Sequence, residues 1–212
     1  MSRRVREVFN ILIASVGGQG GLTLSRAIAI AAVNEGLSVR TGETLGMSQR
    51  FGSVTSFVRI GPQNAVMSPT FSEGMAHVMV GLELTESVRN LRYLCEGGKI
   101  LVADIVKPPI TASIGTVRMP SRDELEGALT SVDPEAVIVP ARKIAYDAGN
   151  PRAVNMVMLG VFNKVFGILS DDAVINAILT LLPGRRGETS VAAYRAGIKW
   201  AEENKVDARL AL

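Results

Sequence analysis

Cysteine and histidine are the residue types that this sequence has least of. The 212-residue chain contains one cysteine, Cys95, and one histidine, His77. A single cysteine provides neither a disulfide framework nor the thiolate ligands of an iron–sulfur cluster within the chain. A closed zinc site of Cys and His ligands is excluded for the same reason, and a catalytic triad would have to use His77. The scarcity of cysteine fits a reducing, cytoplasmic location.

Long apolar runs are also missing. No stretch approaches the roughly 20 apolar residues of a membrane-spanning helix, and residues 154–169 are interrupted by asparagine and lysine. An arginine-rich start at 3–6 precedes the apolar run 11–16, but that run is short and ends in glycines instead of a signal-peptide cleavage site. The net charge of +3 includes no sustained basic stripe. We therefore expect neither a membrane nor a nucleic acid as a partner.

The overall apolar content is high. Hydrophobic residues make up 47% of the chain and the mean hydropathy is +0.25, which excludes a disordered chain. The length suits one domain over residues 1–212, because no repeat, low-complexity tract or linker divides the sequence. Since monomers rarely expose large apolar patches, we expect an apolar surface that is covered by a partner or by self-association.

Apolar periodicity predicts an α/β protein. We expect a Rossmann-like, doubly wound, mostly parallel sheet with helices on both faces, followed by a helical C-terminal third. The expected strands are 9–16, 37–41, 53–60, 76–80, 99–103 and 136–140. The expected helices are 22–34, 85–94, one opening at Ser121 with Glu124 completing a capping box, 150–166, 170–182 and 188–204.

Two local predictions follow from the same pattern. The segments 9–16, 22–34 and 37–41 read as a β-α-β unit, which predicts parallel strands. Asn150 followed by Pro151 reads as an N-cap with proline at the first helical position.

A glycine turn separates the first predicted strand from the first predicted helix. Its sequence is Gly17-Gly18-Gln19-Gly20-Gly21. Glycines let the backbone approach a ligand closely, and the following helix start offers unpaired N–H groups to an anion. The turn departs from a dinucleotide fingerprint, because Thr23 stands where the third glycine belongs. It is also not a Walker A loop, since no Lys-Ser/Thr follows. We predict that the turn contacts a ligand or a partner; a tight turn without a ligand is the alternative.

A second glycine-bounded segment, 46–52, contains the polar run Ser48, Gln49 and Arg50. An arginine guanidinium is suited to phosphate or carboxylate groups. In a doubly wound sheet the loops at the carboxyl ends of the strands form the ligand crevice. We therefore expect Ser48, Gln49 and Arg50 to share one edge with the glycine turn, unless the segment is simply a solvated loop.

We interpret the single histidine and the single cysteine as structural residues. His77 lies in an apolar run, which is typical of a core histidine with a satisfied hydrogen bond. Cys95 follows a predicted helix, and no neighbour in sequence would lower the pKa of its thiol. We expect an inert, partly buried thiol at Cys95 and no catalytic residue in the chain.

The paired motifs resemble those of a known family. The glycine turn, followed by Gly46-Met47-Ser48-Gln49-Arg50-Phe51-Gly52-Ser53-Val54, is similar to the 2-oxoacid:ferredoxin oxidoreductase gamma family, and most closely to its indolepyruvate branch. The resemblance extends to Met158-Leu159-Gly160 and Ala193-Tyr194-Arg195-Ala196-Gly197, so it spans nearly the whole chain. Two departures are Phe51, where a small residue is usual, and Ser190, where asparagine is common.

The resemblance implies an accessory role. In that family thiamine diphosphate and [4Fe-4S] clusters reside largely on other subunits, and the gamma-type module is associated with coenzyme A binding. The implied partner is a large catalytic subunit, with ferredoxin engaged indirectly. The implied reaction is oxidative decarboxylation of an aryl or other 2-oxoacid to an acyl-CoA. By this resemblance, Gly17 to Gly21 and Ser48 to Arg50 are the candidate coenzyme A contacts.

Two alternatives remain open at the level of sequence. The chain could be a stand-alone, Rossmann-like nucleotide-binding protein, which would bind a nicotinamide cofactor by itself. It could also be a pure scaffold subunit whose glycine turn touches only the partner protein. Neither the sequence motifs nor the composition separates a scaffold from a coenzyme A binder.

Overall fold

The computed structural model describes residues 7–46, 52–108, 115 and 118–206. Its centre is a six-stranded sheet of order β2-β3-β1-β4-β5-β6. The strands are β1 (Phe9–Val16), β2 (Ser38–Leu45), β3 (Ser53–Gly61), β4 (Ala76–Gly81), β5 (Leu94–Ala103) and β6 (Val137–Val139). Strands β1, β4, β5 and β6 pair in parallel, and β3 is antiparallel to both of its neighbours. The mostly parallel α/β sheet is therefore confirmed.

The predicted β-α-β unit is only partly right. Strands β1 and β2 run in the same direction, but β3 lies between them. Strands β2 and β3 follow each other closely in the chain, and a short connection favours an antiparallel pair. Strand β2 also continues to Leu45, four residues beyond the predicted end at Thr41, because each of its residues pairs with β3.

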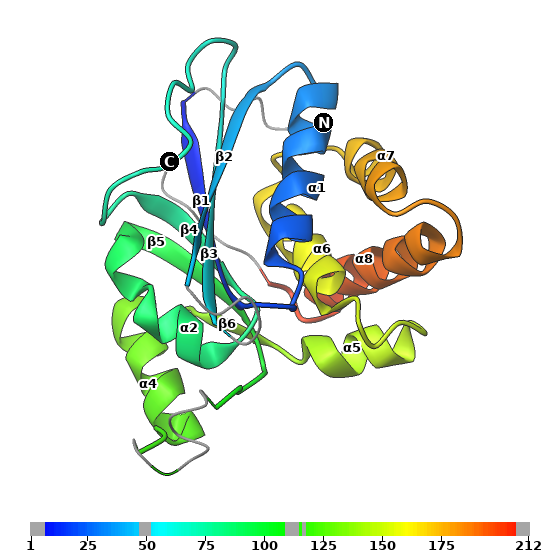
Figure 1. Ribbon diagram of the computed structural model, residues 1–212. Coiled ribbons are helices and arrows are strands. Elements are labelled where there is room, and N and C mark those ends of the chain that lie inside the picture. The colour runs from blue at the N-terminus through cyan, green and yellow to red at the C-terminus, as the bar shows by residue number, and fades with distance from the viewer. Residues whose placement is uncertain (1–6, 47–51, 109–114, 116–117, 207–212) are drawn as a thin grey trace.

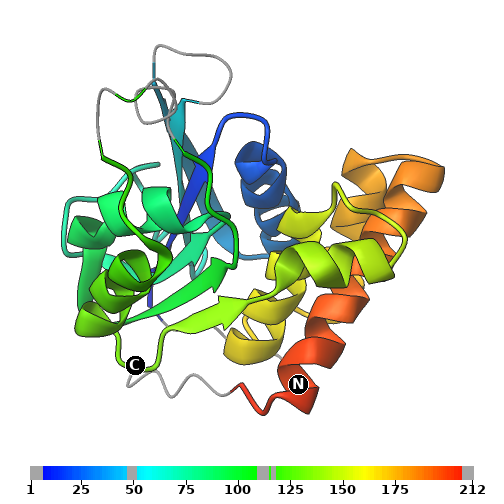
Figure 2. The same cartoon turned by 90° about the horizontal axis from the view of Figure 1, so that it is seen from below.

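Helices cover both faces of the sheet (Figures 1 and 2). Helix α1 (Gly21–Asn34), α5 (Ala141–Asp147), α6 (Val154–Phe166), α7 (Asp171–Leu181) and α8 (Arg185–Glu203) gather on one side. Helix α2 (Leu84–Arg89), the short 3-10 turn η1 (Leu91–Tyr93) and α4 (Arg122–Val132) lie on the other. The helical C-terminal third is confirmed, and residues 94–98 belong to β5 instead of to a helix or loop.

The alternation of side chains along β1 divides the core in two. Ile11 and Ile13 face the cluster that includes α1, α6, α7 and α8, whereas Leu12 and Ala14 face the cluster that includes α2 and α4. All eight residues of β1 are buried. A strand covered on both faces accounts for its near-continuous apolar sequence.

The helix starts match the sequence prediction at two places and not at a third. Ser121 and Glu124 form the predicted capping box of α4, and Ser170 caps α7. Asn150 does not cap α6, which begins four residues later at Val154. The Asn150 side chain instead accepts a hydrogen bond from the Arg152 N–H and donates one to the Thr189 hydroxyl. These bonds hold a turn at 149–153, which delays the helix.

Two glycines bring α6 and α8 together. A Cβ added to Gly160 would collide with the Tyr194 carbonyl oxygen, and one added to Gly197 would collide with the Val157 carbonyl oxygen. The helices therefore touch backbone to backbone, and this contact fixes where the start of α8 lies relative to the start of α6.

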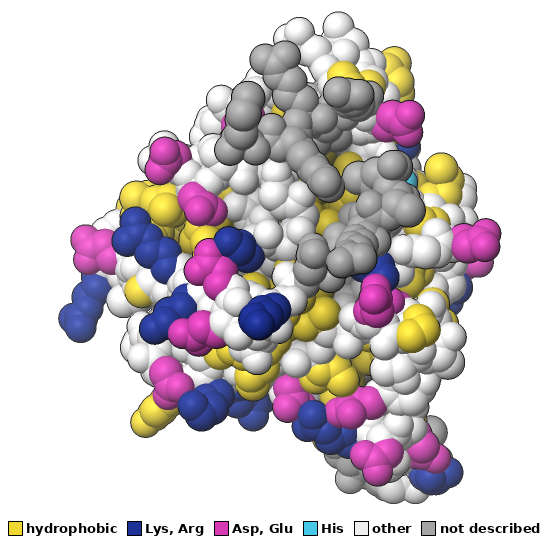
Figure 3. All heavy atoms as spheres, turned by 180° about the vertical axis from the view of Figure 1, so that it is seen from behind, with side chains coloured by type: hydrophobic (Ala, Val, Ile, Leu, Met, Phe, Trp, Pro, Cys, Tyr) yellow, Lys and Arg dark blue, Asp and Glu magenta, His cyan; other side chains and the backbone are white. Residues whose placement is uncertain are grey.

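The described surface shows mixed charge. On the face seen in Figure 3, acidic and basic side chains alternate and apolar side chains appear between them. Among the described residues, no helix combines the length and the apolar character that a membrane span requires.

Candidate functional site

The glycine turn lies where the sequence places it, at the carboxyl end of β1 and the start of α1. Gly18 and Gly20 have φ angles of 93° and 84°, a left-handed conformation that favours glycine. The Gly17 N–H donates to the Gly52 carbonyl oxygen at 2.8 Å, so the turn contacts the residue just before β3. The turn therefore lies at the sheet edge where the parallel strands end.

Gln19 holds the turn to the sheet. Its side-chain oxygen accepts a hydrogen bond from the Val16 N–H at 2.7 Å, and its side-chain nitrogen donates to the Leu82 carbonyl oxygen at 3.1 Å. These bonds join the residues at the carboxyl ends of β1 and β4. Gln19 thus fixes the glycine turn to the ends of two strands.

Gly20 is the point at which α1 meets α6. The Asn155 side chain donates to the Gly20 carbonyl oxygen at 3.1 Å. A Cβ on Gly20 would lie 2.5 Å from the Asn155 side-chain nitrogen, which is closer than real atoms approach. The φ angle favours glycine here, and a Cβ at this position would displace the Asn155 side chain.

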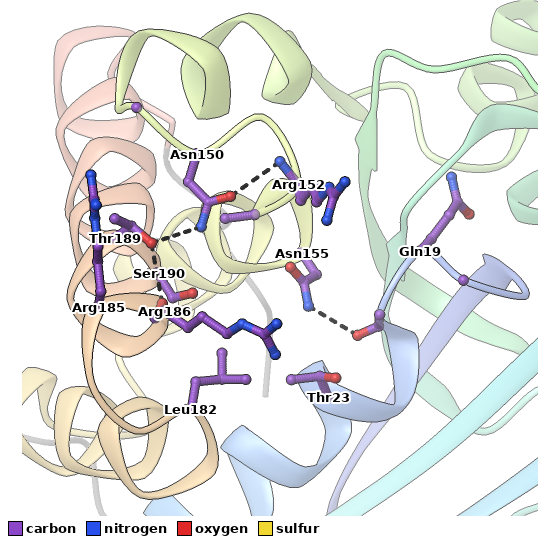
Figure 4. Close-up of a pocket in the computed structure, with 14 residues that line it drawn as sticks. Gln19, Thr23, Asn150, Arg152, Asn155, Leu182, Arg185, Arg186, Thr189 and Ser190 are labelled. Carbon is purple, nitrogen blue, oxygen red and sulfur yellow. Dashed lines mark hydrogen bonds between the residues drawn. The ribbon is translucent and has the colours of Figure 1, made fainter.

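A cavity of about 570 Å³ opens beside the glycine turn (Figure 4). The starts of three helices, α1, α6 and α8, meet at its walls. The lining residues are Gly18, Gln19, Gly20, Thr23, Gly149, Asn150, Arg152, Ala153, Asn155, Leu182, Arg185, Arg186, Thr189 and Ser190. The cavity thus joins residues that lie more than a hundred positions apart in the sequence.

None of these three helices has a side-chain cap at its N-cap position, although the Asn155 side chain accepts the Met156 N–H within the first turn of α6. The N-cap residues of α1, α6 and α8 are Gly20, Ala153 and Gly184, and none accepts a hydrogen bond from the first turn through its side chain. Helices α4 and α7, which start away from the cavity, are both capped by serine. The first N–H groups of an uncapped helix lack an acceptor within it and present a positive dipole end. Three such ends favour an anion in the cavity.

The side chains around the cavity add positive charge. Arg152, Arg185 and Arg186 line it, and within the described part of the chain no ion pair or side-chain hydrogen bond engages any of their guanidinium groups. Among the residues that the structure describes, the lining contains no aspartate or glutamate. Ser190 is only 4% exposed, and its hydroxyl has no hydrogen-bond partner among the described residues. The cavity therefore combines uncompensated cations, helix starts and the hydroxyl of a buried serine.

The predicted site residues divide into three groups. Gly18, Gln19 and Gly20 line the cavity, whereas Gly17 and Gly21 support the turn without lining it. Ser48, Gln49 and Arg50 lie outside the described residues, so their role stays a prediction. Sequence reasoning missed the contribution of α6 and α8, which includes Asn155, Arg186 and Ser190. Nothing in their local sequence connects them to the glycine turn, because only the packed fold brings the helix starts together.

Burial affects the pKa values of the single histidine and the single cysteine. The Nδ1 atom of His77 accepts the Asn10 N–H at 2.9 Å, and its ring stacks on Phe9 at 5.2 Å. Burial lowers the pKa of His77, although the Glu7 carboxylate opposes this shift. Burial raises the pKa of the half-buried Cys95 thiol. Both findings agree with a histidine whose hydrogen bond is satisfied and an unactivated thiol.

A buried glutamate stands at the same sheet edge. Glu83, which is fully buried, caps α2 by accepting hydrogen bonds from the N–H groups of Thr85 and Glu86, and it also accepts one from the Lys107 N–H. Burial raises the pKa of the Glu83 carboxyl group, and these backbone hydrogen bonds oppose the rise. Its oxygens are fully occupied within the fold, so Glu83 holds the edge together. Among the described residues no group of His, Cys, Asp and Glu is arranged to hold a metal ion.

The comparisons with known proteins define the class. The family described as pyruvate ferredoxin/flavodoxin oxidoreductase matches residues 10–200 of the chain. The chain belongs to this family. A relative from Thermococcus kodakarensis, indolepyruvate oxidoreductase subunit IorB, is 34% identical over 92% of this chain and 96% of its own length. The subunit of the same name from Archaeoglobus fulgidus is 42% identical over 75% of this chain and 80% of its own length.

Solved structures share the fold. The gamma subunit of a keto/oxoacid ferredoxin oxidoreductase from Geobacter sulfurreducens has a TM-score of 0.66 at 22% identity, covering 92% of this chain and 99% of that one. The 2-oxoglutarate:ferredoxin oxidoreductase from Magnetococcus marinus, solved with 2-oxoglutarate, coenzyme A and succinyl-CoA bound, has a TM-score of 0.70 at 18% identity. That match covers 95% of this chain and 32% of the other. The same fold thus occurs as a separate subunit and within a longer polypeptide.

Proposed function

We propose that this chain is the small, accessory subunit of an indolepyruvate-type 2-oxoacid:ferredoxin oxidoreductase, and that its cavity receives the phosphate-bearing part of coenzyme A. The family match over residues 10–200 and the coverage of the indolepyruvate subunits support the assignment of class. The observation that carries the cavity assignment is the meeting, around one opening, of three helix starts without an N-cap side chain and three arginines whose guanidinium groups no described residue engages. Coenzyme A is a polyanion with a diphosphate and a separate ribose phosphate, so its charge complements this cavity.

The remaining chemistry belongs to a partner. The chain has one cysteine and one histidine in total, and it is expected to rely on a large catalytic subunit for thiamine diphosphate and [4Fe-4S] clusters. In the proposed reaction a 2-oxoacid loses carbon dioxide, the electron pair passes to ferredoxin, and the acyl group joins the coenzyme A sulfur as its proton is released. This chain would bind and orient coenzyme A. No residue of the chain is assigned to the bond-making steps.

The stand-alone nucleotide-binding alternative is not favoured. Thr23 replaces the third glycine of the dinucleotide fingerprint and lines the cavity, and the family match points to an oxidoreductase subunit. A scaffold that binds no coenzyme A remains the competing account of the cavity, and binding measurements distinguish the two.

Reconstitution tests the assignment of class. We expect the purified chain to show no viologen reduction with indolepyruvate, coenzyme A and thiamine diphosphate. Co-production with the large subunit of the same organism should give a complex that turns over, and omission of this chain should abolish or strongly reduce coenzyme A-dependent turnover. Turnover by this chain alone, or full coenzyme A-dependent turnover by the large subunit alone, would overturn the assignment.

A further inference from the structure

The cavity presents two different walls to an anion. One wall is backbone: the uncapped start of α1 after Gly18 and Gly20, which suits a group held by N–H donors. The other wall is made of side chains at the start of α8, where Arg186 and Ser190 are four residues apart and therefore lie on one face of the helix. Figure 4 shows the Arg186 side chain extending from α8 toward Thr23 and Asn155.

Two polar groups of the side-chain wall, Arg186 and Ser190, have no side-chain partner among the described residues, whereas a third, Thr189, does. Thr189 is engaged by Asn150 and by the Arg186 carbonyl oxygen. The Arg186 guanidinium and the buried Ser190 hydroxyl are not engaged by any described residue. A guanidinium fork beside a hydroxyl donor is suited to a terminal phosphate, because a terminal phosphate carries more charge and more free oxygens on its one phosphorus than either phosphorus of a bridging diphosphate does. Arg185 is less suited, since its side chain lies along the outer side of α8 in Figure 4.

We infer that Arg186, assisted by Ser190, is the specificity-determining residue that recognises the ribose 3′-phosphate of coenzyme A. This inference rests on the proposed function, because it assigns one recognition element within the cavity proposed to take coenzyme A. The backbone wall at the glycine turn is left for the diphosphate. The chain thereby distinguishes coenzyme A from its dephosphorylated form and from other adenine nucleotides without a 3′-phosphate.

Calorimetric titration of the full chain with coenzyme A and with dephospho-coenzyme A tests this inference, because the two ligands differ only in the 3′-phosphate. We expect the parent chain to bind dephospho-coenzyme A roughly 10- to 100-fold more weakly, as the loss of a charge-assisted contact predicts. Arg186→Ala should weaken coenzyme A by the same factor and leave dephospho-coenzyme A unchanged, so that the variant no longer discriminates. Arg186→Lys should restore discrimination only in part.

Arg195→Ala is the matched control. Arg195 is exposed on the same helix, does not line the cavity and has no side-chain partner among the described residues, so this variant should discriminate like the parent. Equal binding of both ligands by the parent, or retained discrimination in Arg186→Ala, overturns the inference and leaves the proposed function standing. Failure of the parent to bind either ligand overturns the coenzyme A assignment as well.

Discussion

At the scale of single residues, the cavity depends on Gly20. This residue combines a φ of 84° with direct contact to the Asn155 side chain, and its carbonyl oxygen accepts the Asn155 hydrogen bond. A side chain at this position would therefore displace the Asn155 side chain and break the hydrogen bond that joins the starts of α1 and α6, which form two walls of the cavity.

Gly20→Ala is expected to lower the free energy of unfolding by about 2–4 kcal/mol, from backbone strain and the collision with Asn155 together. Gly36→Ala is the matched control, because Gly36 has a similar φ of 75° but a Cβ there would meet no atom within 4 Å. That variant should lose only about 1–2 kcal/mol. Urea unfolding of both variants measures the difference, and equal losses would show that the Asn155 contact is unimportant.

His77 links stability to pH. Its Nδ1 atom accepts a hydrogen bond from the Asn10 N–H only while Nδ1 carries no proton, and burial lowers the pKa of the imidazole. The unfolded chain then binds the proton more readily, so stability conferred by neutral His77 is present above its ordinary pKa of about 6.5 and is lost as pH falls below it. Phenylalanine has no group that titrates in this range. The free energy of unfolding of His77→Phe should therefore fall less than that of the parent when the pH is lowered from about 7.5 to about 5.5, roughly one unit either side of the ordinary histidine pKa. Parallel pH profiles for the two proteins would contradict this role.

At the scale of elements, the backbone contact between α8 and α6 fixes the position of α8. Gly160 and Gly197 remove the side chains that would separate the two backbones. These glycines belong to the two C-terminal motifs noted in the sequence, so the motifs mark a helix crossing. The crossing holds the start of α8, and with it Arg186, beside the start of α6.

Gly160→Ala and Gly197→Ala should each destabilise the protein by about 2–3 kcal/mol, because the added methyl group meets a backbone carbonyl oxygen. Gly127→Ala in α4 should do the opposite and stabilise it by about 0.5–1 kcal/mol, since a Cβ there meets nothing and alanine favours a helix. Thermal unfolding of the three variants measures both signs. Stabilisation by Gly160→Ala would show that the helices do not touch at this point.

The elements themselves were largely predictable from local patterns. The buried run of β1, the capping box at Ser121 and the serine cap at Ser170 each carry a local signal, and each is found in the structure. The insertion of β3 between β1 and β2 was not predictable, because strand order depends on long-range pairing. The start of α6 was misplaced because the Asn150 side chain bonds to its own turn and to Thr189 instead of capping a helix.

Only the part of the candidate site that has a local sequence signal was predictable. The glycine turn carries a local signal, since glycines between a strand and a helix indicate a ligand-facing backbone. Arg186 and Ser190 carry none, because an arginine and a serine at a helix start are ordinary surface residues until the fold places them opposite the turn. Composition predicts that the chain holds no redox centre of its own, but composition carries no information on the position of the cationic wall.

At the scale of the whole molecule, the residues that hold the sheet edge in place differ from those that line the cavity and are proposed to bind the ligand. The sheet and its two cores fix the carboxyl edge, Gln19 and Glu83 tie that edge together, and the cavity lies where three helices begin beside it. Every feature assigned to the ligand is a donor or a cation. We therefore expect this chain to affect how the complex uses coenzyme A and not how the complex handles the 2-oxoacid.

The most direct test of this claim is steady-state kinetics of the reconstituted complex carrying Arg186→Ala, compared with the parent and with Arg195→Ala. The KM for coenzyme A should rise roughly 10- to 100-fold, while kcat at saturating coenzyme A and the KM for indolepyruvate stay at the parent values. Arg195→Ala should match the parent in all three constants. An unchanged KM for coenzyme A in Arg186→Ala, or a change confined to the KM for indolepyruvate, would contradict the account.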